Sequence, residues 1–235
     1  VATAEDSFKV IPVSLVTRQD LGMEEEPPAA TSTEGVQIGV HLMQGGARPP
    51  NTKRALEAAG FRVTPRPEMA GRSRAARFGE CDAFVSHSHR DDAGMKLETL
   101  HAWDRESCEG HANVWLDLVC LEQTDLDESL LMLPLFVSGC RSFLILGGPT
   151  YSSRLWCAIE LFAFIQMGGT ADRIVIRLIA EDPVIATRML SFSVDTAECS
   201  FDSDRQMLLA VIESCFGQLS AFDKQMRRLV QERVV

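Results

Sequence analysis

Four short apolar runs, separated by stretches of helical composition, constrain the fold of this chain more than any other feature of its sequence. The runs read CDAFVSH, ANVWLDLV, RSFLILGG and RIVIRLIA, and the segments that lie between them and read as helices are 92–107, 127–138 and 153–167. Nearly continuous apolar strands that alternate with helices are typical of a parallel sheet buried on both faces. The sequence therefore predicts an α/β protein.

The expected architecture is a flavodoxin-like α/β fold, in which a doubly wound parallel sheet carries helices on both faces. We place this domain in residues 80–235. Two further helices extend it at the C-terminus, with the sequences SDRQMLLAVIESCF and SAFDKQMRRLVQERV. The second is amphipathic, because Phe222, Met226, Leu229 and Val230 share one stripe.

Residues 1–79 form an N-terminal extension to this domain. Residues 24–35, EEEPPAATSTEG, have the acidic, proline-containing composition of a linker. Before it, FKVIPVSLV predicts an edge strand, since Pro12 has no N–H to donate within a central strand. After it, VQIGVHLM, NTKRALEAAG and FRVTP predict a small strand, helix and strand unit.

Composition excludes several classes of function and of compartment. A net charge of −10 disfavours a nucleic-acid surface, which needs a basic footprint. The 7 cysteines are dispersed without a C-x-x-C pair, which indicates reduced thiols in an intracellular chain. No apolar run is long enough to span a bilayer, so we expect a soluble, cytoplasmic protein. The chain starts at Val1, and a processed terminus would be compatible with an organelle such as a plastid.

Three polar loops should meet at one edge of the predicted sheet. They are SHSHRDD, DLVCLEQTDLDE and GGPTYSSR, and each follows a predicted strand. In open parallel sheets, ligands bind at the carboxyl ends of the strands. In the third loop, Ser152 or Ser153 can cap the following helix, whose free amide groups would favour a phosphate or diphosphate.

A single carboxylate, Glu160, interrupts the apolar helix that follows this third loop. It lies one turn after Trp156, on the same helical face, in a run that is otherwise almost wholly apolar. A charge in such surroundings costs several kcal/mol of desolvation unless it is paired, hydrogen-bonded or open to a cleft. Glu160 is therefore a candidate functional residue.

Three segments carry a resemblance to a known family. DAFVSHSHRDD, WLDLVCLEQTDL and GPTYSSRLWCAIELF occur in this order between residues 80 and 180. They resemble the signatures of Toll/interleukin-1 receptor (TIR) domains, in particular the TIR-like domains of algae, oomycetes and fungi. The second is also similar to a motif of fungal heterokaryon-incompatibility domains, and the third to the plant TIR pattern around Trp-Cys-x-x-Glu-Leu.

The resemblance implies an NAD-cleaving activity with Glu160 as the catalytic residue. Many TIR domains hydrolyse the bond between nicotinamide and ribose, with NAD as substrate and no cofactor. The leaving group of NAD is already cationic and departs neutral, so no general acid is needed. What develops is positive charge on the ribose, as in glycoside hydrolysis, and one carboxylate can stabilise it. The product would be ADP-ribose or a cyclic form.

Further positions match the family's substrate-binding residues. They are Phe84, Ser86, Trp115, Asp117, Ser153 and Trp156. TIR domains act as assemblies, so the resemblance also implies partners: a homo-oligomer or other TIR-like proteins.

Alternatives remain open for the same residues. Glu160 would have only a structural role if it paired with Arg90 or Arg154, and the tryptophans would then be ordinary core aromatics. The whole domain would then be a catalytically silent TIR-like scaffold, or a structural subunit of a larger complex. His-x-His-x-Asp in SHSHRDD is similar to the start of a metallo-β-lactamase zinc site, but the downstream histidines of such a site are missing. We therefore predict no metal.

Overall fold

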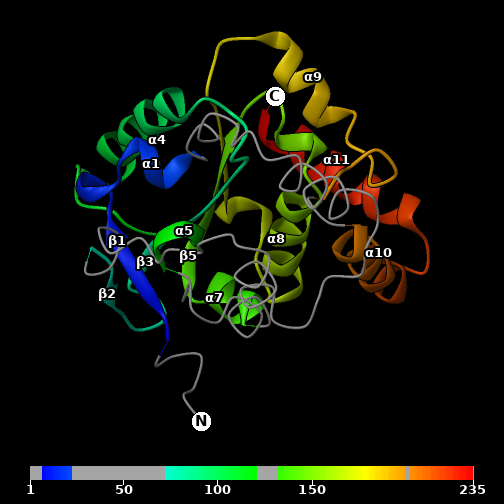
Figure 1. Cartoon of the computed structure of the whole chain (residues 1–235), viewed down its shortest axis with the longest axis horizontal. Helices are drawn as coiled ribbons and strands as arrows, with labels where there is room; N and C mark the ends of the chain where they lie inside the picture. The colour runs from blue at the N-terminus through cyan, green and yellow to red at the C-terminus, as the bar shows by residue number, and fades with distance from the viewer. Residues whose placement is uncertain (1–6, 23–71, 121–131, 200–201, 235) are drawn as a thin grey trace, which may run out of the picture.

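The computed structural model describes residues 7–22, 72–120, 132–199 and 202–234 (Figure 1). In these residues the strands form one six-stranded sheet, in the order β2-β1-β4-β3-β5-β6. The strands are β1 (Lys9–Pro12), β2 (Arg74–Ala75), β3 (Cys81–His87), β4 (Asn113–Trp115), β5 (Cys140–Gly147) and β6 (Ile174–Leu178). β4, β3, β5 and β6 run parallel, and β1 is antiparallel to both of its neighbours. The predicted flavodoxin-like α/β class is confirmed.

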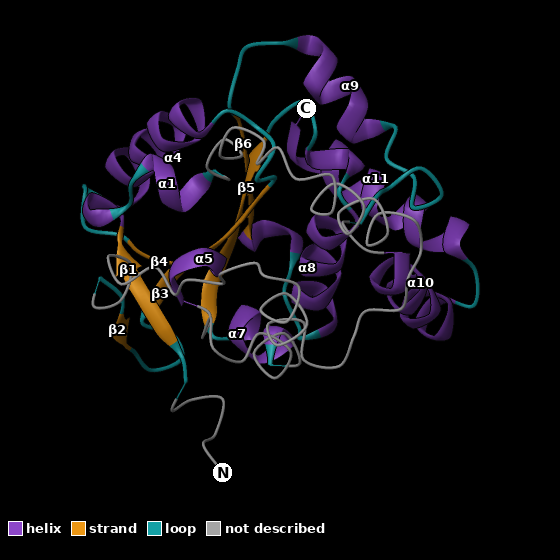
Figure 2. Cartoon of the chain, viewed as in Figure 1, coloured by secondary structure: helices purple, strands orange, loops and turns teal. Residues whose placement is uncertain are grey.

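Helices cover both faces of this sheet (Figure 2). They are α1 (Arg18–Leu21), α4 (Ala93–Cys108), α5 (Asp117–Cys120), α7 (Leu133–Ser138), α8 (Leu155–Gln166), α9 (Pro183–Leu190), α10 (Asp202–Phe216) and α11 (Leu219–Val234). Consecutive side chains of a strand point to opposite faces. In β3, Ser86 bonds to Glu160 of α8, whereas His87 contacts Lys96 of α4. α8 and α4 therefore lie on opposite faces.

Two elements differ from the expected pattern within the parallel part of the sheet. β4 has 3 residues, because the chain turns into α5 at Asp117, whose carboxylate accepts a hydrogen bond from the amide of Leu118. The pattern gave no sign of α9. This helix begins with standard signals nonetheless: the carboxylate of Asp182 caps the amide of Val184, and Pro183 occupies the first turn.

The expectation that residues around Pro12 form an edge strand is wrong. β1 pairs with β4 on one side and with the short β2 on the other, so β2 is the edge. The sheet tolerates Pro12 because it is the last residue of the strand. Phe8 and Val10 are fully buried, so this segment shares the core of the main domain. The predicted linker at 24–35 and the small unit after it lie outside the described residues.

Aromatic side chains fill the centre between the sheet and α8. Phe84 stacks on Trp115 at 4.5 Å between centroids and on Phe143 at 5.4 Å, and Phe143 meets Phe164 of α8 at 5.3 Å. A second aromatic group joins α8 to the predicted C-terminal helices, since Phe222 of α11 contacts Phe162 edge to face at 5.7 Å. These contacts bury one side of α8 against β3 to β5 and another against α10 and α11.

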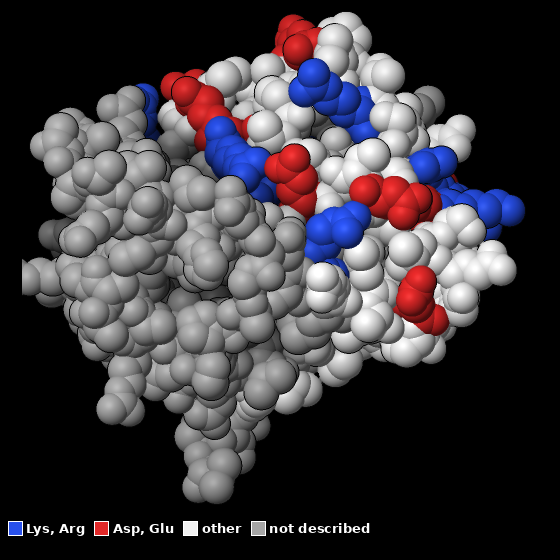
Figure 3. Space-filling view, turned by 45° about the vertical axis from the view of Figure 1, so that its right-hand side comes forward, with Lys and Arg blue, Asp and Glu red and all other residues white. Residues whose placement is uncertain are grey.

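The described surface carries charged side chains of both signs. On the face shown in Figure 3, acidic and basic side chains are interspersed among the described residues, without a broad patch of one sign. Of the helices in the described part of the chain, none is both long and apolar enough to span a bilayer.

Candidate functional site

Glu160 lies on α8 beside the carboxyl end of β3, where a chain of hydrogen bonds holds it. The hydroxyl of Ser86 donates to Glu160 Oε2 at 2.6 Å. The oxygen of Ser86 also lies 2.9 Å from the hydroxyl of Tyr151, the only tyrosine of the chain. Since the Ser86 hydroxyl donates its hydrogen bond to Glu160, its oxygen accepts the bond from the Tyr151 hydroxyl. The side chains of Tyr151, Ser86 and Glu160 are thus joined by successive hydrogen bonds, which orient the carboxyl group of Glu160.

No cation neutralises Glu160 among the described residues. Arg90 pairs with Glu198 at 3.1 Å, and no cation is among the groups that shift the pKa of Glu160. Burial raises the pKa of Glu160 to about 8; the hydrogen bond from Ser86 opposes this shift, and the negative charge of Asp117 adds to it. The protonated form of Glu160 is therefore favoured at neutral pH. A positive charge brought close to it would favour the ionised form.

A second polar cluster lies on the other side of β3, facing α4. Asp117 Oδ2 lies 2.8 Å from His89 Nε2, and Asp117 Oδ1 lies 3.7 Å from His87 Nε2. The Asp117 charge raises the pKa of His89, and the two histidines hold the pKa of Asp117 well below its usual value. Burial lowers the pKa of His87. The ammonium group of Lys96 approaches His87 Nδ1 at 3.4 Å, and burial lowers its pKa to about 8.

The loops after β3 and β5 are locked together by a carboxylate. Asp91 Oδ1 accepts hydrogen bonds from the amide and the hydroxyl of Thr150, at 2.9 and 2.8 Å, and Thr150 Oγ1 also lies 2.7 Å from Ser88 Oγ. Gly148 is required here, because a Cβ atom at that position would lie 2.2 Å from Asp91 Oδ2. These two loops therefore meet as predicted. The described start of the remaining loop joins them, because Asp117 contacts His89 of the loop after β3 at 2.8 Å, whereas residues 121–128 of that loop lie outside the described residues.

Comparisons with protein-family models, with curated proteins and with solved structures find no match to this chain. The TIR resemblance therefore stays a prediction from the sequence motifs.

The structure brings only some of the predicted site residues to one place. Ser86 and Glu160 are in contact, and Trp156 lies half-buried one turn before Glu160 on α8. Asp117 belongs to the histidine cluster on the other side of β3. Phe84 and Trp115 are both 0 % exposed and stack in the core, so in this conformation neither side chain reaches a ligand.

The predicted serine cap of α8 is wrong. The N-cap residue is Arg154, without a side-chain cap, and the hydroxyl of Ser153 donates to the carbonyl of Thr150 instead. The first amide of the helix, that of Leu155, donates to the carbonyl of Glu198 at 3.0 Å. This amide is therefore not free for a phosphate, because a segment distant in sequence already occupies it.

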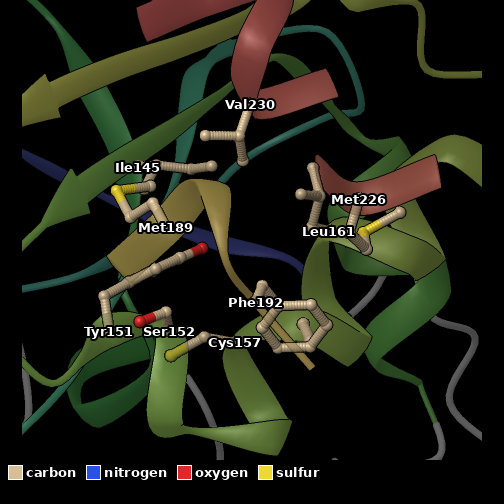
Figure 4. A pocket seen from close by; sticks show the side chains of 10 residues that line it. Ile145, Tyr151, Ser152, Cys157, Leu161, Met189, Phe192, Met226 and Val230 are labelled. Atoms are coloured by element: carbon tan, nitrogen blue, oxygen red, sulfur yellow. The ribbon is translucent and has the colours of Figure 1, made fainter. Parts of the chain in front are cut away.

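A small apolar cavity lies behind Tyr151, between α8, α9 and α11 (Figure 4). Its volume is about 30 Å³, room for one or two waters but not for a nicotinamide ring. Met189, Phe192, Met226 and Cys157 are among the residues that line it. Tyr151, which lines this cavity, bonds to Ser86 through its hydroxyl, so the cavity adjoins the hydrogen-bond chain of Glu160.

Sequence reasoning missed Tyr151, Lys96 and the joining of His87 and His89 to Asp117. The signal for Tyr151 was its position in the loop before α8, among residues already expected to face the sheet edge. For Lys96, helical spacing would have placed it one turn into α4, but nothing local shows that it is 0 % exposed.

Proposed function

We propose that this chain is a TIR-like hydrolase that cleaves NAD and releases nicotinamide, with Glu160 as its catalytic residue. The observation that carries the proposal is the contact of Ser86 with Glu160 at 2.6 Å, at the sheet edge where open parallel sheets bind ligands. Two residues that the family resemblance assigns to one site, from segments 74 positions apart, are thereby in direct contact. A carboxyl group without a cationic partner among the described residues is the group that a cationic substrate would meet.

The reaction needs one negative charge rather than an acid and base pair. The bond between ribose C1′ and the nicotinamide nitrogen breaks, and nicotinamide leaves as a neutral molecule with the bonding electrons. A water oxygen then bonds to C1′ and loses a proton, which gives ADP-ribose. If a nitrogen of the adenine ring attacks C1′ instead of water, the product is cyclic. In both cases ionised Glu160 stabilises the positive charge that develops on the ribose.

Because the pKa of Glu160 is raised, the bound substrate itself would promote the ionisation of this catalytic residue. A bound nicotinamide carries a positive charge, which favours the ionised form of a nearby carboxyl group. Tyr151 and Ser86 would hold the resulting carboxylate in one orientation, so that it does not turn away as it becomes charged. Trp156, on the same face of α8, would supply an apolar wall beside it.

NAD is the substrate and no further cofactor is invoked. As in TIR assemblies, a homo-oligomer or another TIR-like protein would complete the site, in a cytoplasmic or organellar compartment. The direct test is nicotinamide release by the purified chain, compared with the Glu160→Gln variant, in which the side chain keeps its size but cannot ionise.

A catalytically silent scaffold is the second candidate, and one observation favours it. Phe84 and Trp115, both assigned to substrate binding by the resemblance, are buried in the core. A scaffold would use the same fold to bind other proteins, in a TIR-like assembly or a larger complex, with Glu160 as a neutral, half-buried acid. A folded chain that binds NAD in neither the parent nor the Glu160→Gln form would support this candidate.

A further inference from the structure

Three side chains of types that can bind metal ions converge between β3 and α4, on the opposite side of β3 from Glu160. They are His87 at the end of β3, His89 in the loop that follows, and Asp117 at the start of α5. One potential ligand atom of each lies within 4.8 Å of the others. The two imidazole rings are 4.8 Å apart between centroids, and Asp117 lies between their Nε2 atoms at 2.8 and 3.7 Å.

His87 has an unsatisfied nitrogen that points into this cluster. The residue is 6 % exposed, and its Nε2 atom has no hydrogen-bond partner among the described residues. Lys96 contacts the other ring nitrogen, and Lys96 is itself fixed by the carbonyl oxygens of Leu21 and Ser88. The ring is therefore held with Nε2 directed toward Asp117. A buried polar atom without a partner costs free energy, and a metal ion would remove that cost.

We propose that His87, His89 and Asp117 bind a divalent transition-metal ion through the two Nε2 atoms and the carboxylate. Ligand atoms about 2.0–2.1 Å from a tetrahedral Zn²⁺ lie about 3.3 Å from one another. The observed separations of 2.8 and 3.7 Å fall on either side of that value, so shifts of a few tenths of an ångström would form the site. Two imidazoles and a carboxylate suit Zn²⁺, Fe²⁺ and Co²⁺.

The cluster is open on one side. The side chains of His89 and Asp117 are 29 % and 28 % exposed, whereas that of His87 is 2 % exposed. Three protein ligands with access to solvent leave a coordination position for water or another exchangeable ligand. The buried ammonium group of Lys96 repels a second cation, so we expect a dissociation constant in the micromolar range rather than the tighter binding of structural zinc. This inference does not depend on the proposed NAD cleavage.

The test is a titration of the chelator-treated, desalted chain with Co²⁺ and, separately, with Zn²⁺. We expect one Co²⁺ per chain with visible absorption bands of a four- or five-coordinate ion, and displacement of Co²⁺ by Zn²⁺. Mg²⁺ should not compete, because it prefers oxygen ligands. His89→Ala and Asp117→Asn should each weaken binding by roughly 100-fold. His111→Ala, which removes an exposed histidine, is the matched control and should bind as the parent does.

The absence of stoichiometric Co²⁺ or Zn²⁺ binding to the folded parent would overturn the site, as would binding that His89→Ala leaves unchanged. If the variants fail to fold by circular dichroism, X-ray absorption of the zinc-loaded parent decides. Scattering from two imidazoles would support the site, and a shell of oxygen ligands alone would show adventitious binding and reject it.

Discussion

The hydroxyl of Ser86 and the carboxyl group of Glu160 are joined by a hydrogen bond of 2.6 Å that links β3 to α8. This bond opposes the rise in the pKa of Glu160 that burial causes, because it stabilises the ionised form. The contact therefore couples the packing of α8 on the sheet to the charge state of the candidate catalytic residue.

Stability should fall as pH rises because of Glu160. Its pKa in the fold, about 8, is above its unfolded value of 4.5, so this contribution is complete below pH 4.5 and is lost as pH rises through 8. The shift corresponds to at most about 5 kcal/mol, and for a half-buried side chain we expect about 2 kcal/mol. Glu160→Gln should remove this part of the pH dependence, as measured by denaturant unfolding from pH 5 to 9. Identical pH profiles for parent and variant would contradict the assignment.

Ser86→Ala should raise the pKa of Glu160 further, since the variant loses the donor that favours the carboxylate. We expect a loss of about 1 kcal/mol in unfolding free energy and about tenfold lower NAD turnover at neutral pH. Ser142→Ala is a matched control, because Ser142 donates a bond of the same length, 2.6 Å, to the carbonyl of Asp82 instead. It should lose similar stability with no change in turnover; equal turnover losses in both variants would argue against a specific role for Ser86.

Phe84 should act through the core rather than through substrate contact. Phe84→Leu leaves a partial void in the stack with Trp115 and Phe143, so the free energy of unfolding should fall by about 1–2 kcal/mol. The KM for NAD of the folded variant should stay within about twofold of the parent value. A large rise in KM with little loss of stability would instead place Phe84 in the substrate pocket.

The pH dependence of NAD cleavage should report the ionisation of Glu160. Because the carboxylate is the active form, kcat/KM should rise about tenfold per pH unit below the pKa of about 8 in the free protein, and level off above it. The kcat profile should have a lower midpoint, because the bound nicotinamide cation favours the carboxylate. A value of kcat/KM that stays flat or falls between roughly pH 6 and 8 would conflict with this role.

The sequence predicted the parts of this fold that local pattern controls. Apolar runs and helical periods depend on residues that are neighbours in the sequence. The elements predicted from them are confirmed at β3, β5, β6, α4, α8 and α11. The position of β1 was mispredicted, since Pro12 restricts a strand only if it lies in the strand interior, and its place at the end depends on pairing with β4.

The site depends more on contacts between distant segments. Glu160 was identifiable as a lone acid in an apolar helix. The bond between Glu160 and Ser86 could be predicted only through the family resemblance, and the bond between Ser86 and Tyr151 depends on how the third loop folds back. The serine cap was mispredicted because Glu198, more than 40 residues away, satisfies the helix amide. Asp117 meets the two histidines only because β4 and β3 are neighbours in the sheet.

NAD turnover by the parent chain and by Glu160→Gln, measured side by side as nicotinamide release over a range of protein concentrations, tests the central claim most directly. The account predicts release that rises faster than linearly with protein concentration in the parent and falls by at least about 100-fold in a folded variant. Equal release by both proteins, or none from the folded parent under any assembly condition, would contradict it.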